Sequence, residues 1–273
     1  MEKITTAVNP GAFQHRRKIS LRSFLGRIFR MIRQRQWKAL RNFAPAEGLN
    51  LLYESGLLKS RKRFECPICG YEGSYFVSKS NELRIAWHSY CPQCNSRTRH
   101  RGLKFLYDEL LASAAATRLL HFAPEPVLMR VIRQYPAIEY KTTDYLLQDV
   151  DYPGEDIQAL SFADNSFDLV FCNHVIEHVP DDRKALQEIQ RILRPGGKAV
   201  ITIPGVWSRK ETIPFPDLRH NGHYRDYGMD VVQVMQAVFS KVAVKNLHDY
   251  NRNTANGTSH GIPAMEPAFI CTK

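Results

Sequence analysis

A strand pattern that ends in polar and ionisable residues points to a functional site just after residue 172. Residues 170–172 (VFC) are typical of a buried strand, and Asn173, His174, Glu177 and His178 follow within a few positions. Burying such groups without partners costs free energy. Imidazole and carboxylate groups are also the usual carriers of protons in catalysis. We therefore expect these side chains to line a ligand site.

Four of the six cysteines form two Cys-x-x-Cys pairs, Cys66 with Cys69 and Cys91 with Cys94. Each pair on a tight turn can direct two thiolates at one ion, and four sulfurs complete a closed tetrahedral zinc site. The spacing predicts a structural zinc ribbon at residues 60–101, with strands between the pairs. Two redox-active dithiols are the alternative, and they would need a thioredoxin-like surrounding. The remaining cysteines, at positions 172 and 271, are predicted to be buried thiols in a reducing compartment.

A cluster of basic residues follows the second cysteine pair: Arg97, Arg99, His100 and Arg101. These side chains could meet an acidic substrate or RNA. Solvated or salt-bridged surface residues are the commoner outcome for such a cluster.

The net charge of +11 is concentrated in one N-terminal segment. Residues 15–41 contain ten Lys or Arg and no Asp or Glu, and the remainder has 28 basic against 27 acidic residues. Apolar residues recur at three- and four-residue spacing between Leu21 and Ile32, which predicts an amphipathic helix. The helix could dock on this protein or another copy, lie on an anionic membrane surface or contact nucleic-acid phosphates.

Strand and helix patterns alternate from about residue 117 to the C-terminus. Strands are expected at 118–123, 137–144, 155–160, 166–175 and 198–204, with a helix over 180–197 and closing strands near 240–250 and 268–273. This order predicts a Rossmann-like α/β domain with a mostly parallel seven-stranded sheet and helices on both faces. The predicted parts are therefore a basic segment at 1–45, a ribbon at 60–101 and this domain at 102–273, with a linker or turn at 44–50.

No apolar run is long enough to span a membrane, and the first residues have no apolar signal region. These patterns predict a cytoplasmic protein, with peripheral contact at the inner face of the membrane as an option for residues 15–41.

The segment DIQALSFADNSFDLVFCNHVIEHVPDDRKALQEIQRILRPGGKAVITIP, residues 156–204, resembles class I S-adenosylmethionine-dependent methyltransferases of the type 11 kind. The likeness is specific over about fifty residues and looser over 118–273. The chain also resembles a bacterial subgroup with a four-cysteine knuckle pair, a HFAPE loop (residues 121–125) and a later H-x-R-x-Y stretch (residues 223–227). The resemblance implies S-adenosyl-L-methionine as cofactor.

The resemblance also implies a set of cofactor contacts. Asp144 matches the acidic residue that binds the ribose hydroxyls, and a carboxylate can accept from both of them. Asp156 matches the acidic residue near the adenine amine, with Ile157 beside it, and Asn173 and His174 match the loop near the sulfonium. Further expected contacts are His121, Phe122, Ala123 and Glu125 in the first loop, and Tyr145 at the adenine side, where the usual helix is expected to be shortened or missing.

The first loop departs from the family pattern. The family has acidic-x-Gly-x-Gly there, which lets backbone approach the cofactor closely. Here His121, Ala123 and Glu125 stand at the acidic and the two glycine positions, and Pro124 has no amide proton to donate. The loop can still hold the cofactor, with Ala123 small enough and Glu125 supplying a carboxylate; a weakened site is the alternative.

Methyl transfer needs the nucleophile and the methyl group in line, and an oxygen nucleophile benefits from a base. We expect His178 or His223 as the base and Arg225 as an anchor for an anionic acceptor. The predicted function is methyl transfer to a hydroxyl or carboxyl of a small molecule or saccharide. The alternatives are an RNA methyltransferase that binds RNA through the ribbon and basic helix, and a non-catalytic binding module with this fold.

Overall fold

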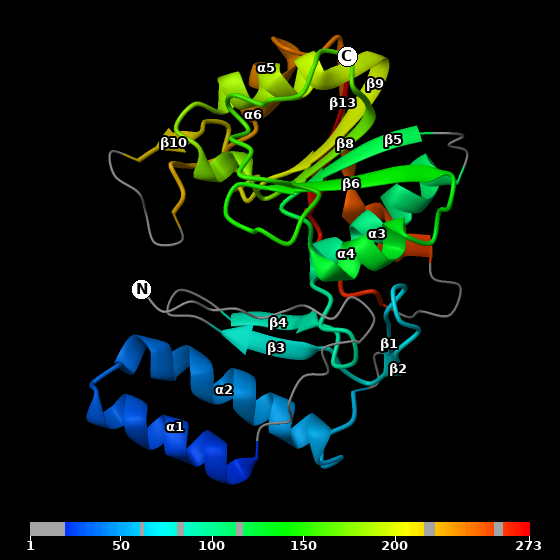
Figure 1. Cartoon of the computed structure of the whole chain (residues 1–273). Helices are drawn as coiled ribbons and strands as arrows, with labels where there is room; N and C mark the ends of the chain where they lie inside the picture. Colours follow the sequence, from blue (N-terminus) through cyan, green and yellow to red (C-terminus); the bar gives the residue numbers. More distant parts are fainter. Residues whose placement is uncertain (1–19, 61–62, 81–84, 113–116, 216–221, 254–258) are drawn as a thin grey trace. The chain divides into compact units, whose positions relative to one another are not determined.

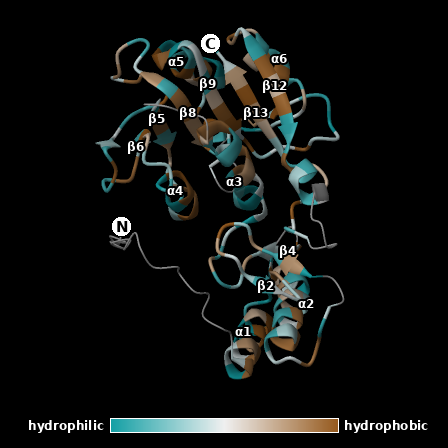
Figure 2. Ribbon diagram, turned by 90° about the vertical axis from the view of Figure 1, so that its right-hand side faces the viewer, coloured by the Kyte–Doolittle hydropathy of each residue, from teal (hydrophilic) through white to brown (hydrophobic). Residues whose placement is uncertain are grey.

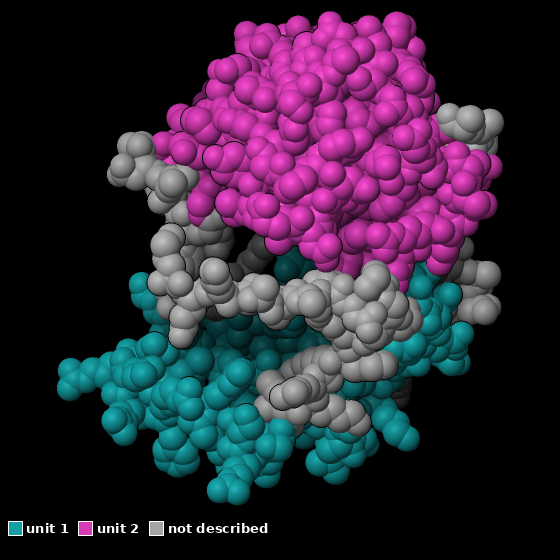
Figure 3. Space-filling view, in the orientation of Figure 1, with its two compact units in different colours: residues 1–105, 248–264 teal, residues 106–247, 265–273 magenta. Residues whose placement is uncertain are grey.

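The computed structural model describes residues 20–60, 63–80, 85–112, 117–215, 222–253 and 259–273 (Figure 1). The chain divides into two compact units, residues 1–105 with 248–264 and residues 106–247 with 265–273 (Figure 3). The segment 248–264 belongs to the first unit although it lies between two strands of the second.

A seven-stranded, mostly parallel sheet forms the centre of the second unit. Its strand order is β12-β13-β9-β8-β5-β6-β7, and β13 alone runs antiparallel to its two neighbours. The predicted α/β class and mostly parallel sheet are confirmed. The bounds are β5 Thr117–Phe122, β6 Ile138–Asp144, β7 Tyr152–Pro153, β8 Phe167–Asn173, β9 Leu193–Thr202, β12 Lys241–Asn246 and β13 Pro267–Thr272.

Helices cover both faces of this sheet (Figure 1). On one face lie α5 (Asp182–Ile192) and α6 (Val231–Gln236), and their buried residues join the main apolar core with side chains of β5, β8, β9 and β13. On the other face lie α4 (Pro126–Ile132) and the C-terminal part of α3 (Thr98–Leu111), whose Tyr107 stacks on Phe171 with ring centroids 3.8 Å apart. The strands carry apolar residues along their length (Figure 2), as two covered faces require.

The connection from β6 to β7 contains no helix in residues 145–151, all of which the structure describes, so the expected loss of a helix there is confirmed. The prediction of a strand at 155–160 is wrong, because β7 is only Tyr152–Pro153 and a turn follows it. Asp156 explains the turn, since its Oδ1 accepts a hydrogen bond from the Gln158 amide at 2.9 Å. Such local side-chain bonds compete with strand pairing.

In the part of the first unit that the structure describes, two helices and two small antiparallel sheets precede the start of α3. The helices are α1 (Leu21–Arg33) and α2 (Trp37–Glu54), and the sheets pair β1 (Phe64–Glu65) with β2 (Glu72–Gly73) and β3 (Val77–Ser80) with β4 (Ile85–Tyr90). The predicted amphipathic helix between Leu21 and Ile32 is confirmed as α1, and the basic segment continues into α2 after a break at residues 34–36. Strands between the cysteine pairs are confirmed.

The prediction of a linker at residues 44–50 is wrong, because α2 runs through it and includes Pro45. Packing outweighs the cost of proline in a helix: Phe43 and Ala46 are buried, and Phe43 stacks with Phe24 at 6.0 Å. Asn50 ties α2 to β3, since its amide nitrogen donates to the Ser78 carbonyl and its oxygen accepts from the Ser78 amide, both at 2.8 Å.

Candidate functional site

The candidate site lies at the carboxyl ends of the parallel strands, where the strand order reverses at β5. Strand β5 pairs with β6 on one side and with β8 on the other. Ligands of doubly wound sheets bind outside such a switch point. The predicted cofactor contacts all follow or end strands β5, β6, β7 and β8, so the topology brings them to one edge of the sheet.

His121 and Asn173 lie beneath this edge and not in open solvent. They are 0% and 2% exposed, and the Asn173 amide nitrogen lies 3.4 Å from His121 Nε2. The same nitrogen donates to the Tyr107 hydroxyl at 2.8 Å, and Asn173 Oδ1 accepts from the Thr202 hydroxyl at 3.1 Å. Burial raises the pKa of Tyr107 well above its usual value. These groups satisfy one another and form a polar floor; Tyr107 and Thr202 carried no signal in the sequence.

The loop after β5 adopts a backbone conformation that is typical of glycine, although a glycine is not present there. Ala123 has φ 46°, and its amide donates to the Thr143 carbonyl at 2.9 Å. Left-handed backbone costs a non-glycine residue about 1–2 kcal/mol. The next residues begin α4, with Glu125 as N-cap and Pro126 in the first turn, while Phe122 is buried in the core.

The end of β6 presents Asp144 beside an exposed apolar group. Asp144 Oδ1 accepts from the amides of Leu146 and Leu147 at 2.7 and 2.8 Å. Tyr145, Leu146 and Leu147 are 65%, 79% and 53% exposed. Exposed apolar side chains that are grouped in this way often mark a surface that binds a ligand or a partner.

After β7, Asp156 and Ile157 are fixed by the turn described above. Asp156 Oδ1 also accepts from the side-chain amide of Gln158 at 3.2 Å, and Gln158 Oε1 accepts from the Asp181 amide at 3.1 Å. Ile157 is 4% exposed and packs in the main core. Asp156 thus connects β7 to the start of α5.

A buried carboxylate with two histidines follows β8. The short helix η1 (Ile176–His178) carries Glu177, whose side chain is 1% exposed. Its Oε1 lies 3.2 Å from His174 Nδ1 and 3.9 Å from His178 Nε2. His174 has φ 54°, a strained conformation of the kind that collects at functional sites. The polar residues expected after residue 172 are thus brought together.

A hairpin brings His223 to this group. Strands β10 (Ile213–Pro214) and β11 (Arg225–Asp226) pair antiparallel, and the Tyr224 amide donates to the Glu177 carbonyl at 3.0 Å. The His178 and His223 rings lie 4.9 Å apart, edge to face. Desolvation by burial lowers the pKa of His223, so the neutral imidazole predominates at pH 7.

Arg225 is held by neighbouring groups. Its guanidinium lies 3.2 Å from Asp182 Oδ2, donates to the Pro180 carbonyl and donates to the Tyr227 hydroxyl at 3.3 Å. Tyr227 in turn donates to Asp182 at 2.9 Å. These bonds fasten the hairpin to the N-terminus of α5.

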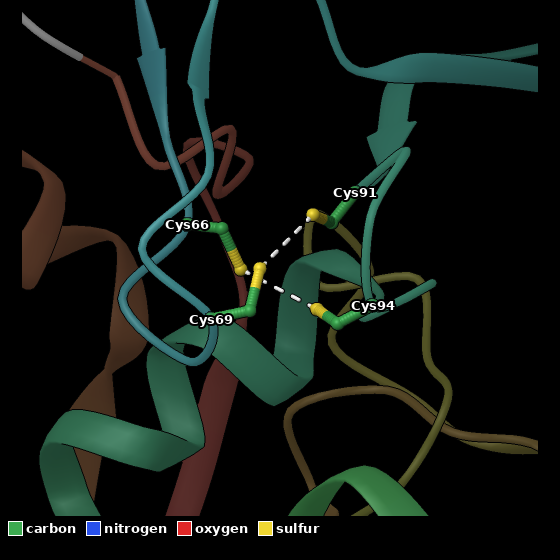
Figure 4. Close-up of side chains that lie close together, drawn as sticks. All are labelled: Cys66, Cys69, Cys91 and Cys94. Atoms are coloured by element: carbon green, nitrogen blue, oxygen red, sulfur yellow. Dashed lines mark hydrogen bonds between the residues drawn. The ribbon is translucent and has the colours of Figure 1, made fainter. Parts of the chain in front are cut away.

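The four predicted zinc ligands converge in the first unit (Figure 4). Cys66 Sγ lies 3.6 Å from Cys94 Sγ, and Cys69 Sγ lies 3.6 Å from Cys91 Sγ, with all four sulfurs within 4.8 Å of one another. Four sulfurs at about 2.3 Å from one zinc ion lie about 3.8 Å apart in a tetrahedron. The donor set therefore fits zinc.

The two cysteine turns share their backbone form. Gly70 and Asn95 follow the second cysteine of each pair, and both have left-handed φ, at 71° and 57°. Each turn is closed by a bond from the residue after the pair, Gly70 to Cys66 and Asn95 to Cys91. Glycine and asparagine adopt this conformation at least cost.

Arg101 does not lie on the surface, contrary to the expectation of a solvated side chain for its cluster. Its side chain is fully buried, stacks over Phe76, and donates to the carbonyls of Ser96, His260 and Gly261. An arginine can be buried where several acceptors satisfy its five donors. Arg101 thereby joins the second cysteine turn to the segment 248–264 within the first unit.

Residues 129–201 match the model of a methyltransferase domain. The match begins inside α4, after the altered first loop, and includes the ends of β6, β7 and β8. It supports a methyltransferase domain of the S-adenosylmethionine-dependent class.

The curated relatives that match over short segments include two methyltransferases. Phosphoethanolamine N-methyltransferase 2 of Caenorhabditis elegans is 45% identical over 56 residues, which is 20% of this chain and 13% of that protein. The ubiquinone/menaquinone biosynthesis C-methyltransferase UbiE of Hydrogenovibrio crunogenus is 38% identical over 60 residues, 22% of this chain and 24% of that protein. The chain thus spans less than a quarter of the length of these relatives.

Solved structures with a similar fold include the 1,6-didemethyltoxoflavin-N1-methyltransferase of Burkholderia thailandensis, with a TM-score of 0.45 and 14% identity over 63% of this chain and 76% of that one. The [4+2]-cyclase SpnF has a TM-score of 0.46 and 17% identity over 73% of this chain and 87% of that one.

Proposed function

We propose that this protein transfers a methyl group from S-adenosyl-L-methionine to a hydroxyl or carboxyl of a small molecule or saccharide. The observation that carries the proposal is the single sheet edge at which Asp144, Asp156 and the Glu177 group all follow parallel strands. A cofactor bound along this edge would have its adenine near the end of β7 and its sulfonium near the end of β8.

Some of the predicted cofactor residues would contact the cofactor, and others would hold the contacting loops in position. Asp144 binds the ribose hydroxyls, Asp156 and the Ile157 amide meet the adenine amine, and Tyr145 packs on the ring. His174 lies at the sulfonium end. Ala123 and Glu125 take the place of the family's glycines, while His121, Phe122 and Asn173 lie beneath and hold the loops in position, as their burial supports.

The acceptor side is built from the histidines after β8 and in the hairpin. His178 and His223 together activate an acceptor hydroxyl, since a neutral imidazole can take its proton and no other pair of imidazoles is this close among the described residues at the edge. Arg225 is proposed to position the hairpin through Asp182 and to offer its charge to an anionic acceptor. An acceptor carboxylate needs no proton removed, so it would depend less on the histidines.

The test is isothermal titration of the zinc-loaded chain with S-adenosylmethionine and with S-adenosylhomocysteine. We expect one binding site with micromolar or tighter affinity for at least one of them, and methyl transfer from labelled cofactor to acceptors in a panel of hydroxy acids and saccharides. No heat with either compound would contradict the proposal. Binding without transfer to any acceptor class, including RNA, would favour the non-catalytic module, and transfer to RNA would favour the RNA methyltransferase.

We further propose that Cys66, Cys69, Cys91 and Cys94 hold a structural zinc ion. The fit of their sulfur separations to a tetrahedron supports it. Four protein ligands leave no open position, so this ion would stabilise the first unit and take no part in methyl transfer.

We also infer that α1 lies on an anionic membrane surface, with docking on another copy of this chain as the alternative. No residue of α1 is buried, and Leu21, Leu25, Phe29 and Ile32 form an exposed stripe although Phe24 already packs on α2. The helix also has arginines and no acidic residue. An apolar stripe with basic flanks fits insertion among anionic lipid headgroups, whereas contact with nucleic-acid phosphates would leave the stripe unexplained. No helix among the described residues is long and apolar enough to cross a bilayer.

A further inference from the structure

Glu177 is a buried carboxylate whose oxygens have no hydrogen-bond partner among the described residues. Its side chain is 1% exposed. Burying an ionised carboxylate without compensation is costly, and such groups are normally paired or bound to a metal ion. The groups nearest to the carboxylate are imidazoles and not arginine or lysine, which are the usual partners of a buried carboxylate.

Three side chains present ligand atoms to one point. The carboxylate of Glu177 and ring nitrogens of His178 and His223 all lie within 4.8 Å of one another. Ligands that share one ion at about 2.0–2.2 Å lie about 3–4 Å apart. The three groups are therefore close to a coordinating arrangement, which a small rotation of the partly exposed His178 ring would complete.

The orientation of His178 is set by a bond on its far side. The Nδ1 atom lies 3.1 Å from the Gly222 carbonyl oxygen. A carbonyl only accepts, so Nδ1 is the donor in this bond, and Nε2 is the ring nitrogen that faces Glu177. Ligand histidines in metal sites are fixed in this way by a carbonyl or carboxylate on the second nitrogen.

The backbone holds His223 in the same place. The amide of Tyr224 donates to the carbonyl of Glu177, so the residue before it is carried directly over η1. The residues on either side of His223 are thus both fixed: Gly222 accepts a bond from His178, and Tyr224 donates one to Glu177. The three groups are held before any ion binds.

We propose that Glu177, His178 and His223 bind one divalent first-row transition-metal ion at the acceptor end of the site. Two imidazoles and one carboxylate suit zinc, cobalt, manganese or iron better than magnesium, which prefers oxygen ligands. Three protein ligands leave coordination positions open for an acceptor oxygen. With an ion bound, His178 and His223 would be its ligands and not free bases, and the ion would activate the acceptor by lowering the pKa of its hydroxyl. That role rests on the proposed methyl transfer, but the binding of the ion does not.

The competing explanation is an ion pair between Glu177 and a protonated His174, whose Nδ1 lies 3.2 Å from Oε1. An ion pair would need no metal and would leave the full chain without a nitrogen–oxygen metal site.

The experiment titrates the full chain, with zinc already bound at the four cysteines, with Co²⁺ and follows visible d–d absorption. We expect one Co²⁺ per chain, without sulfur charge-transfer bands. E177Q, which keeps the shape of the side chain, and H223N are expected to weaken binding at least about tenfold, and the surface variant E139Q is expected to bind as the wild type does. Far-ultraviolet circular dichroism checks folding, and H223N, at a partly exposed position, provides the result if E177Q does not fold.

The proposal would be overturned if the wild type does not bind Co²⁺, or if E177Q and H223N bind Co²⁺ as tightly as the wild type does. Cobalt spectra with sulfur charge-transfer bands would also overturn it. The readout requires neither cofactor nor acceptor. A chain that binds Co²⁺ at this site but not S-adenosylmethionine would contradict the methyl-transfer proposal and leave the metal site standing.

Discussion

His178 donates a hydrogen bond from Nδ1 to the main-chain carbonyl of Gly222, 3.1 Å away, across 44 residues of sequence. This bond joins the segment after β8 to the hairpin that carries His223. His178 and His223 are therefore brought together by the tertiary structure. They lie in two segments whose proximity neither the strand pattern nor the residue spacing predicts.

Asp144→Asn should weaken cofactor binding and leave the turn after β6 intact. The amide oxygen can still accept from Leu146 and Leu147, but the new NH₂ group replaces an acceptor for the ribose hydroxyls. Loss of a hydrogen bond to a charged group costs about 1.5–3 kcal/mol, so we expect cofactor affinity to fall about tenfold to 150-fold in isothermal titration. Asp149→Asn, an exposed change in the same connection, should have no effect; equal loss in both variants would remove Asp144 from the site.

Ala123→Gly should stabilise the protein. Glycine adopts φ 46° without the penalty that alanine has there, and we expect the free energy of unfolding to rise by about 0.5–1 kcal/mol in urea denaturation. Ala137→Gly, at an exposed position without positive φ, should instead destabilise slightly. If Ala123→Gly is the more destabilising of the two, the loop does not have the strained path described above.

Cys69→Ser should remove zinc and loosen the first unit. Native mass spectrometry is expected to show one zinc fewer than in the wild type. Hydrogen exchange should quicken in residues 64–101 and also in residues 259–262, which Arg101 joins to the ribbon. Cys172→Ala removes a cysteine outside the cluster and should keep the zinc. An unchanged zinc count in Cys69→Ser would contradict the four-cysteine assignment.

Phe29→Glu should weaken binding of the chain to vesicles. Phe29 is 70% exposed within the apolar stripe of α1, and a carboxylate there opposes insertion. Co-sedimentation with vesicles containing anionic lipid should fall several-fold relative to the wild type. Ser23→Glu makes the same change in charge at an exposed position outside the stripe and should lose less. Equal losses would mean that charge alone attracts the helix, and an absence of vesicle binding by the wild type would end the membrane proposal.

The sheet could be predicted because its strands are buried on both faces and read as apolar runs, as residues 169–172 do. The cysteine cluster could be predicted because each pair lies on a local turn. Both features depend on residues close together in the sequence or on the repeat of a regular element.

The remaining features depend on contacts across the fold. Residues 44–50 contain turn-forming residues, yet the packing of Phe43 and Ala46 keeps them helical. Asn173 follows a strand as a ligand contact would, but a tyrosine 66 residues away binds its amide. The burial of Glu177 beside His223 likewise needs the hairpin, which residue types alone do not place.

The return of residues 248–264 to the first unit bears on how the chain is made. Arg101 leaves the ribosome well before its acceptor His260, which lies 159 residues further on. Domains generally acquire structure as units, in the order of their synthesis. Here the first unit lacks part of its interior until residues 248–264 have been synthesised, and by then residues 106–247 of the second unit have also been made. A product that stops before residue 248 would therefore expose an incomplete first unit to quality-control proteases.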